Sequence, residues 1–168
     1  MHFGNSEGKG QDQTWLGYLA GGVEIVMVVL ATLMVILVTY QVFQRYVLHY
    51  TPPWSEEMSV YLMIWFGIIG IAAGVRRNSH MALHFFADLM PLGVQRALTF
   101  LKYALVIVYA AVICREGLRL VELTMSQHSP AMGIPVGYVY LCLPVSMALI
   151  ILFTAEAIRN ELRKDRRG

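Results

Sequence analysis

The chain has 168 residues, of which 57% are hydrophobic and 14% are charged. Soluble domains carry about 25% charged residues, so this composition argues against a disordered chain and against an ordinary water-soluble globule. The net charge of +2 is too small for a nucleic-acid binder. The two cysteines, Cys114 and Cys142, lie inside apolar runs and cannot form a disulfide scaffold or a Cys-rich metal site. The sequence predicts a small integral membrane protein.

Four apolar runs are long enough to cross a bilayer, which takes about 20 residues in a helix. The runs 25–44 and 58–75 contain no charged residue, and the third, 97–114, is interrupted only by Lys102. The fourth run begins after Pro135. We therefore expect an all-α membrane protein with a single membrane domain over residues 1–168 and four transmembrane helices, at about 16–45, 55–76, 95–120 and 136–157.

Helix-breaking residues separate and interrupt these runs. Pro52 and Pro53 end the first helix, and Ser55 is a candidate N-cap for the second. Pro144 lies inside the fourth run, where it is expected to kink the helix and to free a carbonyl about one turn upstream.

Positive charges are divided unequally between the two sides of the predicted membrane domain. If both termini face the cytoplasm, ten Lys and Arg residues lie on the inner side and three on the outer side, which obeys the positive-inside rule. We therefore predict that both termini are cytoplasmic. The inner set is Lys9, Arg76, Arg77, Arg96, Lys102, Arg159, Arg163, Lys164, Arg166 and Arg167, and the outer set is Arg45, Arg115 and Arg119.

The segment 80–90, between the second and third runs, is too short to cross the membrane. His80, His84 and Asp88 recur every four residues and share one helical stripe, and most of the remaining residues are apolar. This pattern predicts a short amphipathic helix along the cytoplasmic interface, close to Arg76 and Arg77. The same three residues are adequate for a metal site, but no further His or Cys lies nearby, so we favour a hydrated polar face and predict no metal.

Little else in the sequence points to catalysis. The chain has no Gly-rich phosphate loop, no Walker-type lysine and no Ser/His/Asp arrangement at a suitable depth. The five histidines lie at a terminus, beside predicted spans or in a loop rather than on facing helices, which argues against haem. We therefore expect no enzyme, no catalytic residue and no cofactor.

Glu24 is the deepest candidate for a coupling carboxylate within the predicted spans. Carboxylates inside membranes mark ion or proton pathways, so one alternative is a stand-alone proton-coupled exporter that uses Glu24. The preferred interpretation is that a long, tilted first helix leaves Glu24 at the cytoplasmic interface.

Charged residues also lie near the outer ends of the spans. Arg45 can pair with Glu56 or Glu57 across one short connection, either as a structural clasp or with one carboxylate left to face a partner. Arg119 can pair with Glu122 on the next turn of the third helix.

Three glycines, Gly67, Gly70 and Gly74, lie along the second predicted helix. In lipid, small residues let another backbone approach closely, because packing drives helix association there. The spacing does not decide whether the approaching helix belongs to this chain or to a second subunit.

Several stretches, in their order and spacing, resemble one known family. They are residues 42–47 (VFQRYV), 53–57 (PWSEE), 65–80 and 129–135 (SPAMGIP), followed by Tyr140 and Leu143-Pro144. They are similar to the small, DctQ-like membrane subunit of tripartite ATP-independent periplasmic (TRAP) transporters. The resemblance covers about residues 17–157. One departure is His84, which stands near a position where that family often has an acidic residue.

The resemblance implies a scaffold, or stator, subunit in the bacterial inner membrane. It implies a large membrane subunit that carries the sodium and substrate sites and moves as an elevator. It also implies a periplasmic substrate-binding protein that delivers an organic anion such as a dicarboxylate or sialic acid. The expected function is therefore secondary active transport, a sodium-driven symport, within surrounding membrane lipids.

We also assign surfaces to these expected partners. The large subunit is expected to contact the glycines of the second helix or the kinked fourth helix at Pro144. The binding protein is expected to dock on the outer loops, whose candidate residues for docking or for an ion-pair clasp are Arg45, Trp54, Glu56, Glu57 and Arg119.

Overall fold

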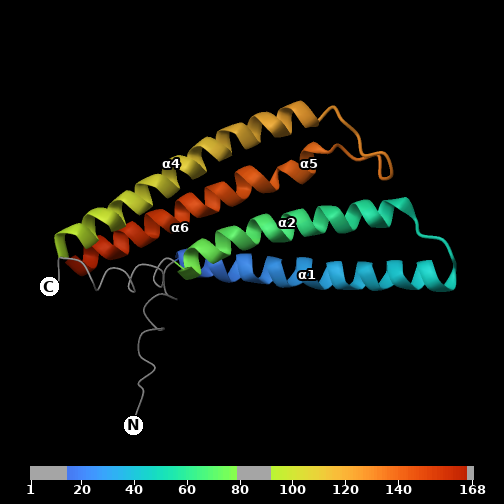
Figure 1. Cartoon of the computed structure of the whole chain (residues 1–168), viewed down its shortest axis with the longest axis horizontal. Helices are drawn as coiled ribbons and strands as arrows, with labels where there is room; N and C mark the ends of the chain where they lie inside the picture. The colour runs from blue at the N-terminus through green and yellow to red at the C-terminus, as the bar shows by residue number, and fades with distance from the viewer. Residues whose placement is uncertain (1–14, 79–91, 166–168) are drawn as a thin grey trace, which may run out of the picture.

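The structure is a computed structural model that describes residues 15–78 and 92–165. Within these ranges, four helical spans are long and apolar enough to cross a membrane, which confirms the predicted all-α membrane fold. The predicted interfacial helix over 80–90 lies outside the described residues. The helices are α1 (Trp15–Val47), α2 (Pro53–Asn78), α4 (Leu92–Thr124) and the last span, divided into α5 (Gly137–Tyr140) and α6 (Cys142–Asp165) (Figure 1).

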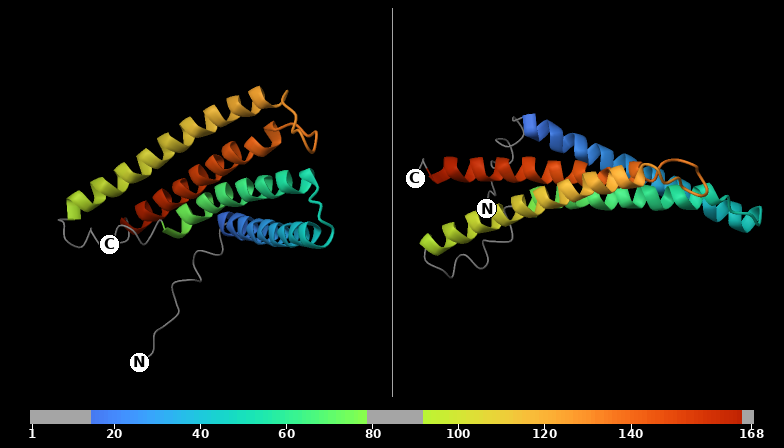
Figure 2. Two further views of the ribbon diagram at one scale, coloured as in Figure 1. Left: turned by 45° about the vertical axis from the view of Figure 1, so that its right-hand side comes forward. Right: turned by 90° about the horizontal axis from the view of Figure 1, so that it is seen from above.

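The helices lie side by side in the spatial order α4, α6, α2, α1 (Figures 1 and 2). The main helix contacts follow this order, since α6 packs against both α4 and α2, and α1 packs against α2. The last span is therefore the most enclosed, with half of its apolar window buried, whereas none of the corresponding window of α1 is buried. The chain forms an open row of helices, and its edge helix α1 presents apolar side chains on nearly all sides.

At the centre of this row, small residues of α2 and α4 pack against larger side chains of α6. Ala72 of α2, Ala110 of α4, and Met147 and Ile150 of α6 form a buried cluster. In a membrane, helices associate by close packing rather than by the hydrophobic effect, so small side chains at the contact are favourable.

The helices α4 and α6 approach each other closely at Gly117. A Cβ atom added to Gly117 would lie 3.2 Å from the Cβ atom of Leu143 and 3.2 Å from the Cδ atom of Pro144. The pyrrolidine ring of Pro144 is thus buried against α4. Pro144 itself is covered by α4 of the same chain, and the contact of the kinked fourth helix with a second subunit stays a prediction.

The predicted interruption of the last span is present at Leu141, three residues before Pro144. Pro144 has no backbone N–H to donate to the carbonyl of the preceding turn. Helical hydrogen bonds continue on both sides of the interruption, from Leu141 N–H to Gly137 O at 3.1 Å and from Val145 N–H to Leu141 O at 3.2 Å. The break therefore interrupts the span at one residue without unfolding it.

Both α1 and α4 have 33 residues, which corresponds to a length of about 50 Å at 1.5 Å per residue. The hydrocarbon core of a bilayer is only about 30 Å thick, so these helices must tilt or extend beyond it. Figure 2 shows that α1 crosses α2 obliquely. The predicted long, tilted first helix is consistent with this geometry.

We predict that Gly117→Leu destabilises the chain, because the added side chain would overlap Leu143 and Pro144. Overpacking of this kind costs about 1–3 kcal/mol. Thermal unfolding of the purified chain in detergent should show a lower Tm. The control is Gly21→Leu, because Gly21 on α1 has no atom within 4 Å of an added Cβ; equal Tm values for the two variants would contradict the prediction.

Candidate functional site: helix ties and exposed surfaces

Residues 48–52 and 125–136 join the helices at one end of the molecule, which we call the loop end. At this end, Glu57 connects the two halves of the chain. Its carboxylate accepts hydrogen bonds from the hydroxyl of Ser129, from Ala131 N–H at 3.1 Å and from Met132 N–H at 3.2 Å. Glu57 is half-buried and directly follows the first turn of α2. The structure therefore gives this carboxylate a loop as its partner, in place of the predicted clasp with Arg45.

The loop that surrounds Glu57 also bonds to itself. Ser129 N–H donates to Ile134 O, and Gly133 N–H donates to Ser129 O, both at 2.9 Å. Val136 N–H donates to Gln127 O at 2.9 Å, which closes the base of the loop. Gly133 has a φ of +68°, in the left-handed region that favours glycine. The loop is thus a compact turn in which the Ser129 hydroxyl and the N–H groups of Ala131 and Met132 donate to the Glu57 carboxylate.

A polar contact ties α1 to α2 near the same end. The Gln41 side-chain amide donates to the Ser55 carbonyl and to the Ser59 hydroxyl, both at 2.5 Å. Ser55 does not cap α2 as predicted, because the helix begins two residues earlier and the Ser55 hydroxyl donates to Pro52 O at 2.7 Å. Since Ser55 is fully buried, this tie lies inside the chain and is unavailable to partners.

The remaining predicted residues of the loop end are exposed. Arg45 and Glu56 lie on the surface, and Trp54 is exposed beside Tyr40, with 6.0 Å between their ring centroids. Arg119 bonds to Glu116 at 3.1 Å, one turn before it, and not to Glu122 as predicted. The exposed members of the predicted docking surface thus lie toward the loop-end termini of α1, α2 and α4.

A second tie lies at the opposite end, where α1 begins and α6 ends. Arg76 Nε lies 3.9 Å from Glu156 Oε2, and its guanidinium carbon lies 5.5 Å from the ring centroid of Phe153. Glu156 is buried, so its carboxylate lies within the contact between α2 and α6. Arg76 therefore joins α2 to α6 within this chain.

Other residues predicted for the cytoplasmic interface fall near or beyond this tie. Arg77 lies in the last turn of α2. His80, His84 and Asp88 are outside the described ranges. Within residues 15–78 and 92–165, no group of three or more His, Cys, Asp or Glu side chains could hold a metal ion.

The three predicted glycines of α2 do not share one environment. Gly70 faces α1, where an added Cβ would lie 3.5 Å from Met27 Cε, an ordinary contact. Gly67 and Gly74 have no atom within 4 Å of an added Cβ. Together with three exposed apolar residues they form one stripe on the outward face of α2, which we call the α2 stripe: Val60, Met63, Gly67, Ile71 and Gly74.

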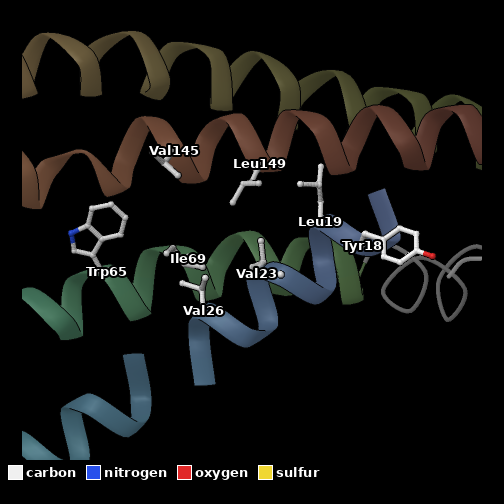
Figure 3. Close-up of a pocket in the computed structure, with 9 residues that line it drawn as sticks. Tyr18, Leu19, Val23, Val26, Trp65, Ile69, Val145 and Leu149 are labelled. Atoms are coloured by element: carbon white, nitrogen blue, oxygen red, sulfur yellow. The ribbon is translucent and has the colours of Figure 1, made fainter. Parts of the chain in front are cut away.

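A crevice of about 650 Å³ lies between α1, α2 and α6 (Figure 3). Figure 3 shows side chains from all three helices directed into this space. None of its nine lining residues is charged, so the crevice offers no side-chain cation to compensate the lost hydration of an organic anion. Its lining is Tyr18, Leu19, Gly22, Val23, Val26, Trp65, Ile69, Val145 and Leu149.

Comparison with known proteins identifies the family. Residues 34–164, from the middle of α1 to the end of α6, match the family described as tripartite ATP-independent periplasmic transporters, DctQ component. The chain belongs to this DctQ family. Since the match runs through all four spans, the predicted resemblance is confirmed, and the chain is a multi-pass membrane protein related to transporter components rather than to enzymes.

Individual relatives of this chain come from several bacterial transporters. It is 25% identical over 140 residues to the sialic acid TRAP transporter small permease protein SiaQ of Vibrio cholerae, covering 83% of this chain and 81% of SiaQ. It is 27% identical over 120 residues to the C4-dicarboxylate TRAP transporter small permease protein DctQ of Pseudomonas aeruginosa, covering 68% of this chain and 57% of that protein.

A third relative is much longer than this chain. The isethionate TRAP transporter permease protein DctMQ of Oleidesulfovibrio alaskensis is 26% identical over 157 residues, which cover 88% of this chain. The chain spans only 25% of the length of DctMQ. The DctQ-like sequence in that relative is therefore one part of a larger permease polypeptide.

We predict that Gln41→Leu loosens the contact between α1 and α2, because the amide's two interhelical hydrogen bonds are lost. Interhelical hydrogen bonds in membranes contribute about 0.6 kcal/mol on average and up to about 1.7 kcal/mol. Thermal unfolding should show a lower Tm for Gln41→Leu than for Gln44→Leu. Gln44 is the matched control because its side-chain amide bonds to Tyr40 within the same helix; a larger effect at Gln44 would contradict the assignment.

Proposed function

We propose that this DctQ-family chain is the small, fixed membrane subunit of a sodium-driven TRAP transporter that imports an organic anion. In this proposal the large membrane subunit carries the sodium and substrate sites and moves as an elevator. A periplasmic binding protein delivers the anion. The chain lies in the bacterial inner membrane with both termini in the cytoplasm, so the loop end faces the periplasm. The positive-inside distribution of Lys and Arg supports this orientation.

The observation that carries the proposal is the match to DctMQ. In that relative, a stretch similar to nearly the whole of this chain accounts for a quarter of one permease polypeptide. The remaining three quarters provide room for a second, larger membrane unit. We infer that this chain assembles with a separate large subunit in the same manner.

The fixed role is supported by the way the helices are tied. The Glu57 contact lies at the loop end of the helices, and the Arg76 contact lies at their opposite end. The cluster that contains Ala72 and Ala110 packs the centre. The uncharged crevice is poorly suited to an organic anion. A chain built in this way is better suited to hold a neighbour in position than to move a substrate itself.

The class of anion follows from the relatives alone. Their names refer to sialic acid, to C4-dicarboxylates and to isethionate, all of which are organic anions. We therefore propose an organic anion, with sialic acid and dicarboxylates as the first candidates.

Reconstitution tests this function directly. The chain should be placed in lipid vesicles alone and together with its co-purified large subunit, under an inward sodium gradient and with the binding protein outside. Labelled sialic acid, dicarboxylates and isethionate should enter only vesicles that contain both membrane subunits. Sodium-driven uptake by the chain alone would refute the proposal.

The exporter alternative is tested by Glu24→Gln. Glu24 lies on the exposed side of α1 and does not line the crevice. We predict that this variant, assembled with the large subunit, retains the wild-type uptake rate, because the proposed coupling ion binds elsewhere. Loss of transport with normal assembly would instead favour Glu24 as a coupling carboxylate.

We further propose that the α2 stripe contacts the large subunit, and that lipids and the same subunit cover α1. The stripe is apolar, exposed and open at two glycines, which suits close approach of a second helix. In contrast, Met27 of α1 already fills the space beside Gly70.

We predict that Gly67→Leu and Gly74→Leu weaken association with the large subunit without unfolding the chain, because both positions have open space around them. Co-purification from membranes in detergent should fall by about fivefold or more, the factor that corresponds to roughly 1 kcal/mol. Ile71→Leu is the matched control, since it changes shape on the same stripe without adding volume. Undiminished co-purification of both glycine variants would show that the large subunit binds elsewhere.

A further inference from the structure

We propose that Glu57 is a positioning residue for binding-protein docking. By fixing the conformation of residues 127–136, it joins this loop and the start of α2 into one preformed docking face. This inference rests on the proposed function, in which the loop end faces the periplasm. It assigns Glu57 a role different from that of its neighbour Glu56, although the sequence pattern alone does not distinguish the two carboxylates.

The chemistry of the contact depends on an ionised carboxylate. One oxygen of Glu57 accepts from Ala131 N–H, and the other accepts from Met132 N–H and from the Ser129 hydroxyl. A carboxylate has two acceptor oxygens, whereas the amide of Gln replaces one of them with a donor. A Gln side chain at this position would therefore direct N–H groups at one of the loop's own donors.

The donors come from a turn that only partly sustains itself. Met132 N–H also reaches Ser129 Oγ at 3.1 Å, and Gly133 N–H bonds to Ser129 O. For Ala131 N–H, however, the partner in the structure is the Glu57 carboxylate. Hydrogen bonds to a charged acceptor are about twice as strong as neutral ones. Glu57 therefore stabilises the observed conformation of the loop beyond what the loop's own hydrogen bonds supply.

The docking face consists of groups that lie on both sides of this contact. From the loop, Pro130, Ala131 and Gly133 are exposed, and from the first turn of α2, Trp54 and Glu56 are exposed. These two segments are far apart in sequence, and Glu57 binds one to the other. The Glu57 side chain itself is half-buried beneath the loop, so it acts through the shape of the face.

Preorganisation explains why such a contact would matter for a soluble partner. A loop that must be ordered on binding reduces affinity, because association then has to offset the lost conformational freedom. A preformed face avoids this cost at every encounter with the binding protein. The expected signature is a change in the concentration of binding protein needed for uptake, with the maximal rate retained.

The test uses the complete two-subunit complex in vesicles under an inward sodium gradient, with the binding protein titrated from outside. Three variants are compared with the wild type: Glu57→Gln, Ser129→Ala and Glu56→Gln. Hydrogen exchange measures the protection of the amides of Ala131 and Met132 in the same preparations. Thermal unfolding and co-purification with the large subunit report separately on assembly.

We expect Glu57→Gln to speed exchange at Ala131 and Met132 by about fivefold or more and to raise the half-saturating concentration of binding protein by a similar factor. The maximal uptake rate should stay at the wild-type level. Ser129→Ala removes one donor and leaves both backbone donors, so it should give a smaller change in the same direction. Glu56→Gln should leave the exchange rates unchanged, because Glu56 does not take part in the loop's hydrogen bonds.

Three results would overturn the proposal, and they are distinguishable. Unchanged exchange in Glu57→Gln would show that the carboxylate does not fix the loop. Faster exchange with an unchanged half-saturating concentration would show that the loop does not form the docking face. Uptake by the wild-type complex that does not depend on the binding protein would refute the proposed function itself, before any variant is considered.

Discussion

Close packing of the last span between α2 and α4 is the contact on which the rest of the structure depends. Lipid provides no hydrophobic force that drives helices together, so association requires backbones to approach closely. Gly117 allows this approach on the α4 side, and Ala72 and Ala110 allow it at the centre. Once α6 is held in this way, the other helices occupy positions on either side of it.

Two carboxylates then hold the ends of this packed centre. Glu57 binds the loop that precedes α5, and Glu156 lies within reach of Arg76 at the opposite end. Both contacts join the first pair of helices to the second pair, and both involve groups that are at least half-buried. Rotation or sliding of α2 against α6 would break a contact at one end or the other. The ties therefore help to keep the row in one arrangement, as the proposed fixed role requires.

Features set by local sequence could be predicted, because they depend on hydropathy and on backbone chemistry. The four spans follow from run length, and the interruption near Pro144 follows from its missing N–H. The family followed from several short stretches in order, without knowledge of any contact. None of these inferences required the spatial order of the helices.

Features set by contacts between distant residues could not be predicted in the same way. Glu57 and Ser129 are 72 residues apart, and neither stretch of sequence indicates that it contacts the other. The turn-forming residues of 129–133 were the available signal, since such a turn exposes backbone donors that require an acceptor. Gly117 is a single glycine without a repeat, so a search for spaced pairs favoured α2 instead. Arg119 has an acidic residue three positions away on both sides, and helical spacing cannot choose between them.

The open row of helices also affects how a complex would sit in the bilayer. A flat array has two broad sides, and a neighbouring subunit that covers one of them leaves the other to acyl chains. The edge helix α1 is not buried along its apolar span. Its place at the edge widens the cross-section of the whole assembly in the membrane plane. A wider body displaces more lipid when it rocks, so it resists tilting more strongly than a compact one. In the proposed complex, the outermost helix would thus help the assembly to resist tilting when the large subunit moves.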